Sequence, residues 1–207
     1  MKTLYTKFDK QDINNLPKVQ FEGRVFVIQS KSEARKAVKY LLSFPRVGID
    51  TETRPNFKPG AMHPVALLQV STSEACFLFR LNRIGLPDCL VQLLTDEHTQ
   101  KVGLSLHDDW AQLRRRTDFQ PVNYIELQDY VKPLGIQDMS LQKLYANLFH
   151  QKISKAQRLT NWEADVLTEP QKRYAATDAW ACLRLMEETD RLLTTQAFEL
   201  IDNSEET

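Results

Sequence analysis

Acidic side chains in three separate segments are the groups of this chain best suited to chemistry. Asp50 and Glu52 end an apolar stretch, and Asp109 follows a second apolar stretch. Asp178 lies in a long segment with helical spacing. Carboxylate ligands without histidine or cysteine suit Mg²⁺ or Mn²⁺ better than Zn²⁺. Two such ions held by carboxylates are a common arrangement for cleaving phosphodiesters, so we expect a two-ion site if these segments meet.

Tyr174 lies four residues before Asp178, in a segment that otherwise holds only alanine and threonine. Residues four apart share one face of a helix, and the small residues allow that face to pack closely. An ionised aspartate on such a face is costly unless it is paired or binds a metal. A phenol titrates near ~10 and is a poor free base. We therefore expect Tyr174 to hold a water molecule by a hydrogen bond.

Each acid alone also has a simpler interpretation. An Asp-x-Glu pair at the end of a strand is common and can face solvent. Asp108 and Asp109 open an expected helix, where a carboxylate can act as an N-cap and favour the helix dipole. An unrelated α/β domain with acids on its surface is thus an alternative, although it requires three separate coincidences.

A basic group lies between the second and third acidic segments. Lys155 and Arg158, together with Lys152, precede Trp162. These cations could contact phosphates, or they could belong to a solvated loop. Trp162 could stack on a base or pack in the core or at its rim. With Thr51, which stands between the first two acids, Lys155, Arg158 and Trp162 are the candidate substrate-binding residues.

The elements that must position these residues follow from apolar spacing and capping signals. Ser30 with Glu33 and Thr168 with Gln171 are capping boxes that predict helix starts, the second for a helix reaching about residue 194. Residues 54–63 are expected to form a loop. Expected strands cover residues 24–28, 47–50, 65–70, 76–79, 101–106 and, briefly, 124–127, and further helices cover residues 86–94, 108–116 and 140–149. This order predicts an α/β fold with a mixed sheet.

Composition limits the function classes. The net charge is zero, so only a local basic surface could attract nucleic acid. The three cysteines are far apart and predict neither a zinc site nor a disulfide framework. No apolar run approaches the ~20 residues of a membrane span, and no signal peptide is evident. We expect a cytoplasmic protein without membrane contact. Its expected parts are an N-terminal arm (1–20), one domain (21–195) and a flexible C-terminal tail (196–207).

Three motifs, taken together, resemble the DEDD family of 3′–5′ exonucleases in its tyrosine subclass. They lie in the family order between about residues 24 and 190. In that order they are VGIDTET (47–53) followed by PVALLQ (64–69), KVG (101–103) with Asp109 six residues later, and LTEPQKRYAATDA (167–179), which RLTNW (158–162) precedes. The histidine subclass would need histidine where this chain has Arg173.

The resemblance implies a ribonuclease H-like mixed β-sheet flanked by α-helices. It also implies that Asp50 bridges two metal ions, either Mg²⁺ or Mn²⁺. Glu52 and Asp178 would complete the first metal site, and Asp109 would hold the second ion. Tyr174 would position the attacking water as the fifth catalytic residue. The register of the second motif favours Asp109 over Asp108 as the metal ligand, and Asp108 would then be an N-cap or a supporting group.

The implied reaction is hydrolysis of the last phosphodiester bond of a single-stranded or 3′-ended nucleic acid. The products would be nucleoside 5′-monophosphates. Within the family the chain is similar to ribonuclease D and more closely to Werner-type exonuclease domains, which favours DNA and leaves RNA possible. A catalytically inactive exonuclease fold that binds nucleic acid or protein is the alternative, and it would be expected to lack one of the acids.

Overall fold

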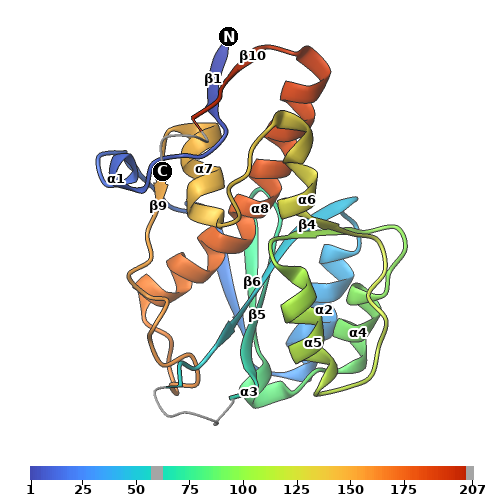
Figure 1. The fold of residues 1–207 in the computed structure, drawn as a ribbon. Helices are drawn as coiled ribbons and strands as arrows, with labels where there is room; N and C mark the ends of the chain where they lie inside the picture. Colours follow the sequence, from blue (N-terminus) through green and yellow to red (C-terminus); the bar gives the residue numbers. More distant parts are fainter. Residues whose placement is uncertain (57–62, 204–207) are drawn as a thin grey trace.

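The computed structural model describes residues 1–56 and 63–203. A six-stranded mixed sheet with strand order β3-β6-β5-β4-β7-β8 forms its centre (Figure 1). The strands are β3 (Arg24–Ile28), β4 (Arg46–Thr53), β5 (Val65–Ser71), β6 (Ala75–Arg80), β7 (Gln100–Gly103) and β8 (Tyr124–Glu126). Strands β4, β5 and β6 pair antiparallel, whereas the remaining pairs are parallel. The expected mixed sheet and the hairpin of β5 and β6 are confirmed.

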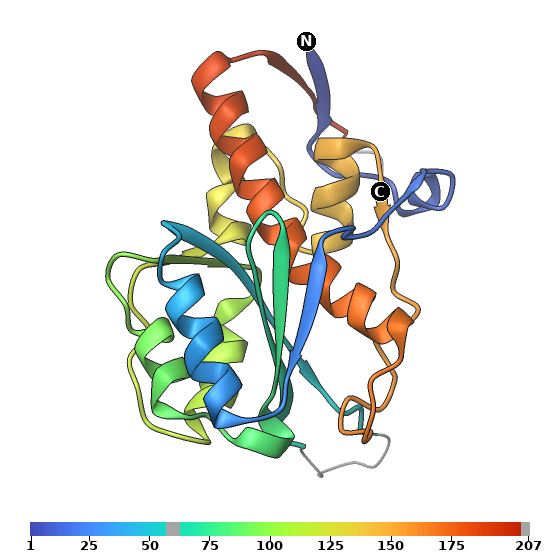
Figure 2. The same ribbon diagram turned by 180° about the vertical axis from the view of Figure 1, so that it is seen from behind.

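Helices cover both faces of this sheet. One face packs on α2 (Lys31–Leu41), α4 (Asp88–Leu94) and α5 (Leu106–Arg114), which gather on one side in Figure 2. The long α8 (Glu169–Thr195) crosses the other face and packs also on α7 (Leu141–Phe149). Short elements connect these layers: α1 (Lys10–Ile13), α3 (Leu81–Ile84), α6 (Leu127–Tyr130) and a 3₁₀ turn at Lys132–Leu134. None of the helices in the described residues has the length and apolar character to cross a bilayer.

The helix starts follow the capping signals in the sequence. Both expected capping boxes are present, at Ser30 before α2 and at Thr168 before α8. The connection between β7 and α5 differs from the expectation. The strand expected at 101–106 ends at Gly103, and the helix expected from 108 begins at Leu106. Ser105 takes the N-cap position, so the alternative interpretation of Asp108 or Asp109 as an N-cap is wrong, and both acids lie instead in the first turn of α5.

The two ends of the described chain pack together. Strand β1 (Lys2–Tyr5) pairs in parallel with β10 (Phe198–Ile201), and Leu4 of β1 is fully buried. Strand β2 (Lys18–Val19) pairs with β9 (Lys152–Ile153). The prediction of a loose arm at 1–20 is therefore wrong for β1 and β2, and that of a flexible tail from 196 is wrong for β10. Pairing with strands distant in sequence holds these segments in place. Residues 204–207 of that tail and 57–62 of the expected loop lie outside the described residues.

A glycine allows α8 to approach β4 closely. A β-carbon added to Gly48 would lie 2.0 Å from the carbonyl oxygen of Ala179. That distance is far below van der Waals contact, and the clashing atom belongs to the helix backbone, which cannot rotate away as a side chain would. Gly48 precedes Asp50 by two residues, and Ala179 follows Asp178. The close approach therefore sets the spacing of these two acids.

We expect Gly48→Ala to lower the free energy of unfolding by about 1–3 kcal/mol, because the new methyl group must push α8 away from the sheet. Urea denaturation followed by circular dichroism measures the change. A variant as stable as the wild-type protein would show that α8 can move without cost and would contradict this account of the close approach.

Candidate metal centre and active site

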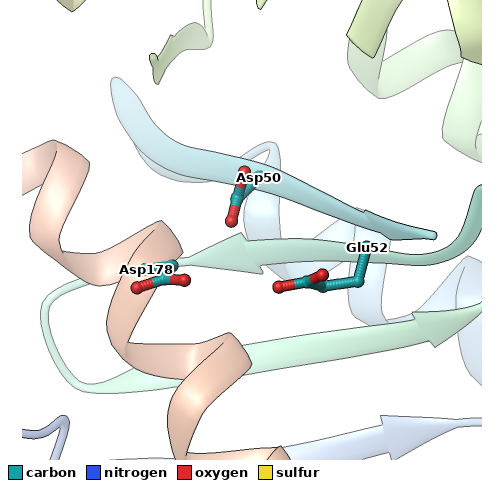
Figure 3. A group of neighbouring side chains, drawn as sticks. All are labelled: Asp50, Glu52 and Asp178. Carbon is teal, nitrogen blue, oxygen red and sulfur yellow. The ribbon is translucent and has the colours of Figure 1, made fainter. Parts of the chain in front are cut away.

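Three of the predicted acids meet between β4 and α8. Asp50 and Glu52 project from β4 and Asp178 projects from α8, and Figure 3 shows their carboxylates converging. Each offers one oxygen, and these oxygens all lie within 4.8 Å of one another. Asp50 and Glu52 face the same side because they are two residues apart on a strand. The structure thus brings together one acid pair from the first motif and one acid from the third.

The charges of these acids oppose one another in a buried setting. Burial and the neighbouring Asp178 hold the pKa of Asp50 well above its usual range. The same two causes, in the same order, raise the pKa of Glu52 to about 9, and burial raises that of Asp178 to about 7. Among the described residues, none of these acids forms an ion pair with a lysine or arginine.

This donor set fits a divalent cation. Two or more carboxylates at one place are stable in the ionised state only if a positive charge lies among them. Oxygen donors alone are the ligands that Mg²⁺ and Mn²⁺ prefer. Asp50, Glu52 and Asp178 are therefore the residues that would hold such an ion.

Asp109 approaches the cluster from α5, which packs on the opposite face of the sheet from α8. The hydroxyl of Thr51 donates a hydrogen bond to Asp109, although Thr51 points away from Asp50 along the strand. Burial raises the pKa of Asp109 to about 6, the hydrogen bond from Thr51 opposes this rise, and Asp108 adds to it. Asp109 does not belong to the group of three acids, but its charge also raises the pKa of Asp50. Asp108 is exposed.

The short strand β7 makes this approach possible. It pairs with β4 only from Arg46 to Gly48, so the part of β4 that carries the acids extends beyond it. Helix α5 begins in this position after Ser105, which has a left-handed backbone with φ of 61°. No side-chain cap comes from Ser105 itself. Instead the carboxylate of Glu126 accepts hydrogen bonds from the N–H groups of Ser105 and Leu106, at 2.9 and 2.7 Å.

Glu126 was not among the predicted site residues. The available signal was its position in the brief strand expected at 124–127. The structure shows that this strand, β8, pairs in parallel with β7, the strand before α5. Without knowing that β8 lies beside β7, that signal could not be connected to the helix start. Glu126 fixes the first turn of α5 and thereby the place of Asp109.

Tyr174 lies on the same face of α8 as Asp178, as the spacing predicted. The phenol lies close enough to Asp178 to lower the pKa of that carboxyl. Burial first, and then the charges of Asp178 and Glu52, raise the pKa of Tyr174 far above its usual value. The ring of Trp162 packs at 6.0 Å from that of Tyr174. Trp162 is 0% exposed, so its assignment as a substrate-stacking residue is wrong, and it supports the tyrosine instead.

Lys155 and Arg158 are exposed at the edge of the cluster. The positive charge of Arg158 lowers the pKa of Glu52, and that of Lys155 lowers the pKa of Asp178. Ion pairs of Arg54 with Glu163 (3.3 Å) and of Arg83 with Asp165 (2.8 Å) hold the segment that follows these two cations.

A groove of about 1440 Å³ lies on the other side of Tyr174. Residues 18–23, the segment around Ser154 and the outer face of α8 from Arg173 to Arg191 line it. Tyr174 contributes to both the groove and the acidic cluster, but none of the four acids lines the groove. The chemistry therefore belongs to the acidic cluster and not to this larger space.

Comparisons with known proteins agree with the geometry. A family model described as 3′–5′ exonuclease matches residues 25–193. The bifunctional 3′–5′ exonuclease/ATP-dependent helicase WRN of Mus musculus is 30% identical over 203 residues, which cover 93% of this chain but only 14% of the mouse protein.

Two solved structures show the same fold. The EXO domain of Nibbler from Aedes aegypti superimposes with a TM-score of 0.76 at 18% identity, over 86% of this chain and 92% of that one. Ribonuclease D of Escherichia coli, described as an exoribonuclease involved in structured RNA processing, gives a TM-score of 0.71 at 22% identity, over 81% and 46% of the two chains. The expected ribonuclease H-like arrangement of a mixed sheet between helices is confirmed.

The acidic cluster makes the stability of the metal-free protein depend on pH. The pKa values of Asp109, Asp178 and Glu52 are raised to about 6, 7 and 9, whereas in the unfolded chain such carboxyls titrate near ~4. At pH values between the unfolded and the folded pKa, the folded state therefore binds more protons than the unfolded state. We expect the free energy of unfolding in EDTA to fall as pH rises through this range.

Mn²⁺ should reverse this loss, and by more at about pH 8 than at about pH 5.5, because it binds the ionised carboxylates. Melting temperatures across this range, with EDTA or Mn²⁺, measure both effects. Asp178→Asn is the comparison, since it removes one charge and should flatten the pH dependence in EDTA. Equal pH dependence in the two proteins would contradict the assignment of these shifts to the cluster.

Proposed function

Because the chain belongs to the 3′–5′ exonuclease family, we propose that it is a metal-dependent enzyme that hydrolyses the terminal phosphodiester bond at the 3′ end of a nucleic acid. The released products are nucleoside 5′-monophosphates. The observation that carries the proposal is the meeting of three carboxylates, those of half-buried Asp50 and Glu52 and of buried Asp178, with oxygens within 4.8 Å of one another and with Tyr174 on the helix face of Asp178. An inactive fold would not need to keep this costly arrangement of like charges.

Two divalent cations, Mg²⁺ or Mn²⁺, complete the proposed site. Asp50, Glu52 and Asp178 would hold the first ion, and Asp109 with Asp50 would hold the second. Bound ions of this kind stabilise charge on the phosphate and lower the pKa of water. The oxygen-only donor set supports this assignment, as does the lack of an ion pair to Asp50, Glu52 or Asp178 among the described residues.

Tyr174 positions the attacking water. Its pKa is raised, so the phenol stays neutral and acts through its hydrogen bond and not as a base. Trp162, whose ring packs against that of Tyr174, restricts its orientation. Lys155 and Arg158 lie where they can attract the phosphates of the strand, and they remain the proposed substrate contacts. Thr51 instead acts on Asp109, which its hydroxyl orients.

The proposed substrate is a single-stranded or 3′-ended nucleic acid, with DNA favoured. The motif similarity to Werner-type domains supports DNA, and the mouse relative combines its exonuclease with a helicase. The likeness to ribonuclease D keeps RNA as a second substrate to be tested. We also propose a cytoplasmic location, which agrees with the three free cysteines.

Digestion of matched DNA and RNA oligonucleotides, labelled at the 3′ or 5′ end, tests the proposal. We expect a ladder that shortens from the 3′ end with Mg²⁺ or Mn²⁺ and stops with EDTA. Asp50→Asn should nearly abolish it, because this acid belongs to both proposed ion sites. Asp108→Asn is the matched control, since this neighbouring acid is exposed and should be dispensable. If neither polymer is cut with either ion, the binding-module alternative would replace the enzyme.

Tyr174→Phe should lower kcat about 10²-fold, the usual effect of losing one oriented hydrogen bond in the transition state. The fold should persist, because the ring still packs on Trp162. Single-turnover digestion gives the rate, and thermal denaturation checks the fold. Tyr124→Phe, at an exposed tyrosine, is the control. A variant with the wild-type rate would remove Tyr174 from the mechanism.

A further inference from the structure

Gln69 has a buried side chain whose polar atoms are unpaired. The residue is 0% exposed, and within the described residues neither its amide nitrogen nor its amide oxygen has a hydrogen-bond partner. It lies in the middle of β5, a central strand of the sheet. Buried amides almost always have partners, because leaving one unpaired destabilises the fold. A buried glutamine that keeps both groups free therefore needs a reason outside ordinary packing.

The strand register places Gln69 directly beside the acidic cluster. Gln69 is paired with Asp50 across the antiparallel strands β4 and β5, and with Leu78 across β5 and β6. Directly opposite residues of an antiparallel pair point to the same face, with β-carbons roughly 4.5–5.5 Å apart. Of the two cross-strand neighbours, only Asp50 can accept a hydrogen bond.

The nearest polar group on the same strand face is already engaged. Ser71 lies two residues beyond Gln69 and donates its hydroxyl to the carbonyl of Thr72 at 2.8 Å. Leu67, two residues before Gln69, is apolar and pairs with Glu52. The amide of Gln69 thus has apolar Leu67 and the already engaged Ser71 as neighbours on its own strand face, with Asp50 as the polar group directly opposite.

We propose that Gln69 is a positioning residue for Asp50, whose carboxylate it holds by an amide N–H hydrogen bond when that carboxylate binds a cation. This inference rests on the proposed function, since it concerns the same metal site. A carboxylate has room for a cation and for further donors on its two oxygens. Groups that hydrogen-bond to ligating carboxylates fix their orientation, and their loss typically weakens metal binding by 10–100-fold.

Direct Mn²⁺ titration by calorimetry, at a fixed pH near 7.5, tests this role without relying on activity. Gln69→Met keeps the length of the side chain and removes the amide. We expect its affinity for Mn²⁺ to fall about tenfold. Leu78→Met is the matched control, because it changes the other cross-strand neighbour of Gln69 at an equally buried position. Its affinity should stay within about twofold of the wild-type value.

Thermal denaturation in EDTA separates this role from a structural one. Gln69→Met, and Gln69→Leu as a second variant, should be at least as stable as the wild-type protein, because each removes an unpaired buried amide. Wild-type affinity in the variants would overturn the inference, as would a clear loss of metal-free stability in both. If the wild-type protein itself binds no Mn²⁺, the proposed function fails, and with it the basis of this inference.

Discussion

The close packing of α8 on β4 is the contact on which the candidate site depends. The backbone of Ala179 lies where a side chain on residue 48 would be, so only glycine fits there. Because Asp178 and Asp50 are one and two residues from this contact, their carboxylates meet within the 4.8 Å cluster. The small residues around Tyr174 serve the same packing, and the tyrosine and the aspartate consequently face the sheet together.

That packing places like charges in a buried setting and so opposes stability. Burial raises the pKa of each acid, and repulsion from neighbouring carboxylates raises the pKa of Asp50 and Glu52 further, so the ionised cluster is unfavourable without a cation. The fold tolerates this cost because the surrounding core is extensive and the sheet is covered on both faces. A bound cation would relieve this repulsion. Cation binding would therefore stabilise the folded protein. The buried, unpaired amide of Gln69 likewise lowers the stability of the metal-free fold, and in our proposal it positions Asp50 for the cation.

Residues from both faces of the sheet meet at the acidic cluster because neighbouring strands differ in length. Strand β4 continues past the end of β7, and α5 begins beside the exposed part of β4. Alternation along β4 then directs Asp50 toward α8 and Thr51 toward Asp109. Glu126, at the end of β8, holds the start of α5 in this position. Asp109 thus comes near the other three acids because β4 extends past β7, although it lies on the opposite face of the sheet.

The sequence by itself determined the elements whose signals are local. The capping boxes, the hairpin of β5 and β6, and the shared face of Tyr174 and Asp178 could all be predicted, since neighbouring residues decide them. Tertiary structure alone decided the pairing of Lys2 with Phe198, the burial of Trp162, and the start of α5 at Leu106. Each depends on a partner distant in sequence, whose position no local pattern encodes. The unpaired amide of Gln69 belongs with these, because only the register of β4 and β5 places it opposite Asp50.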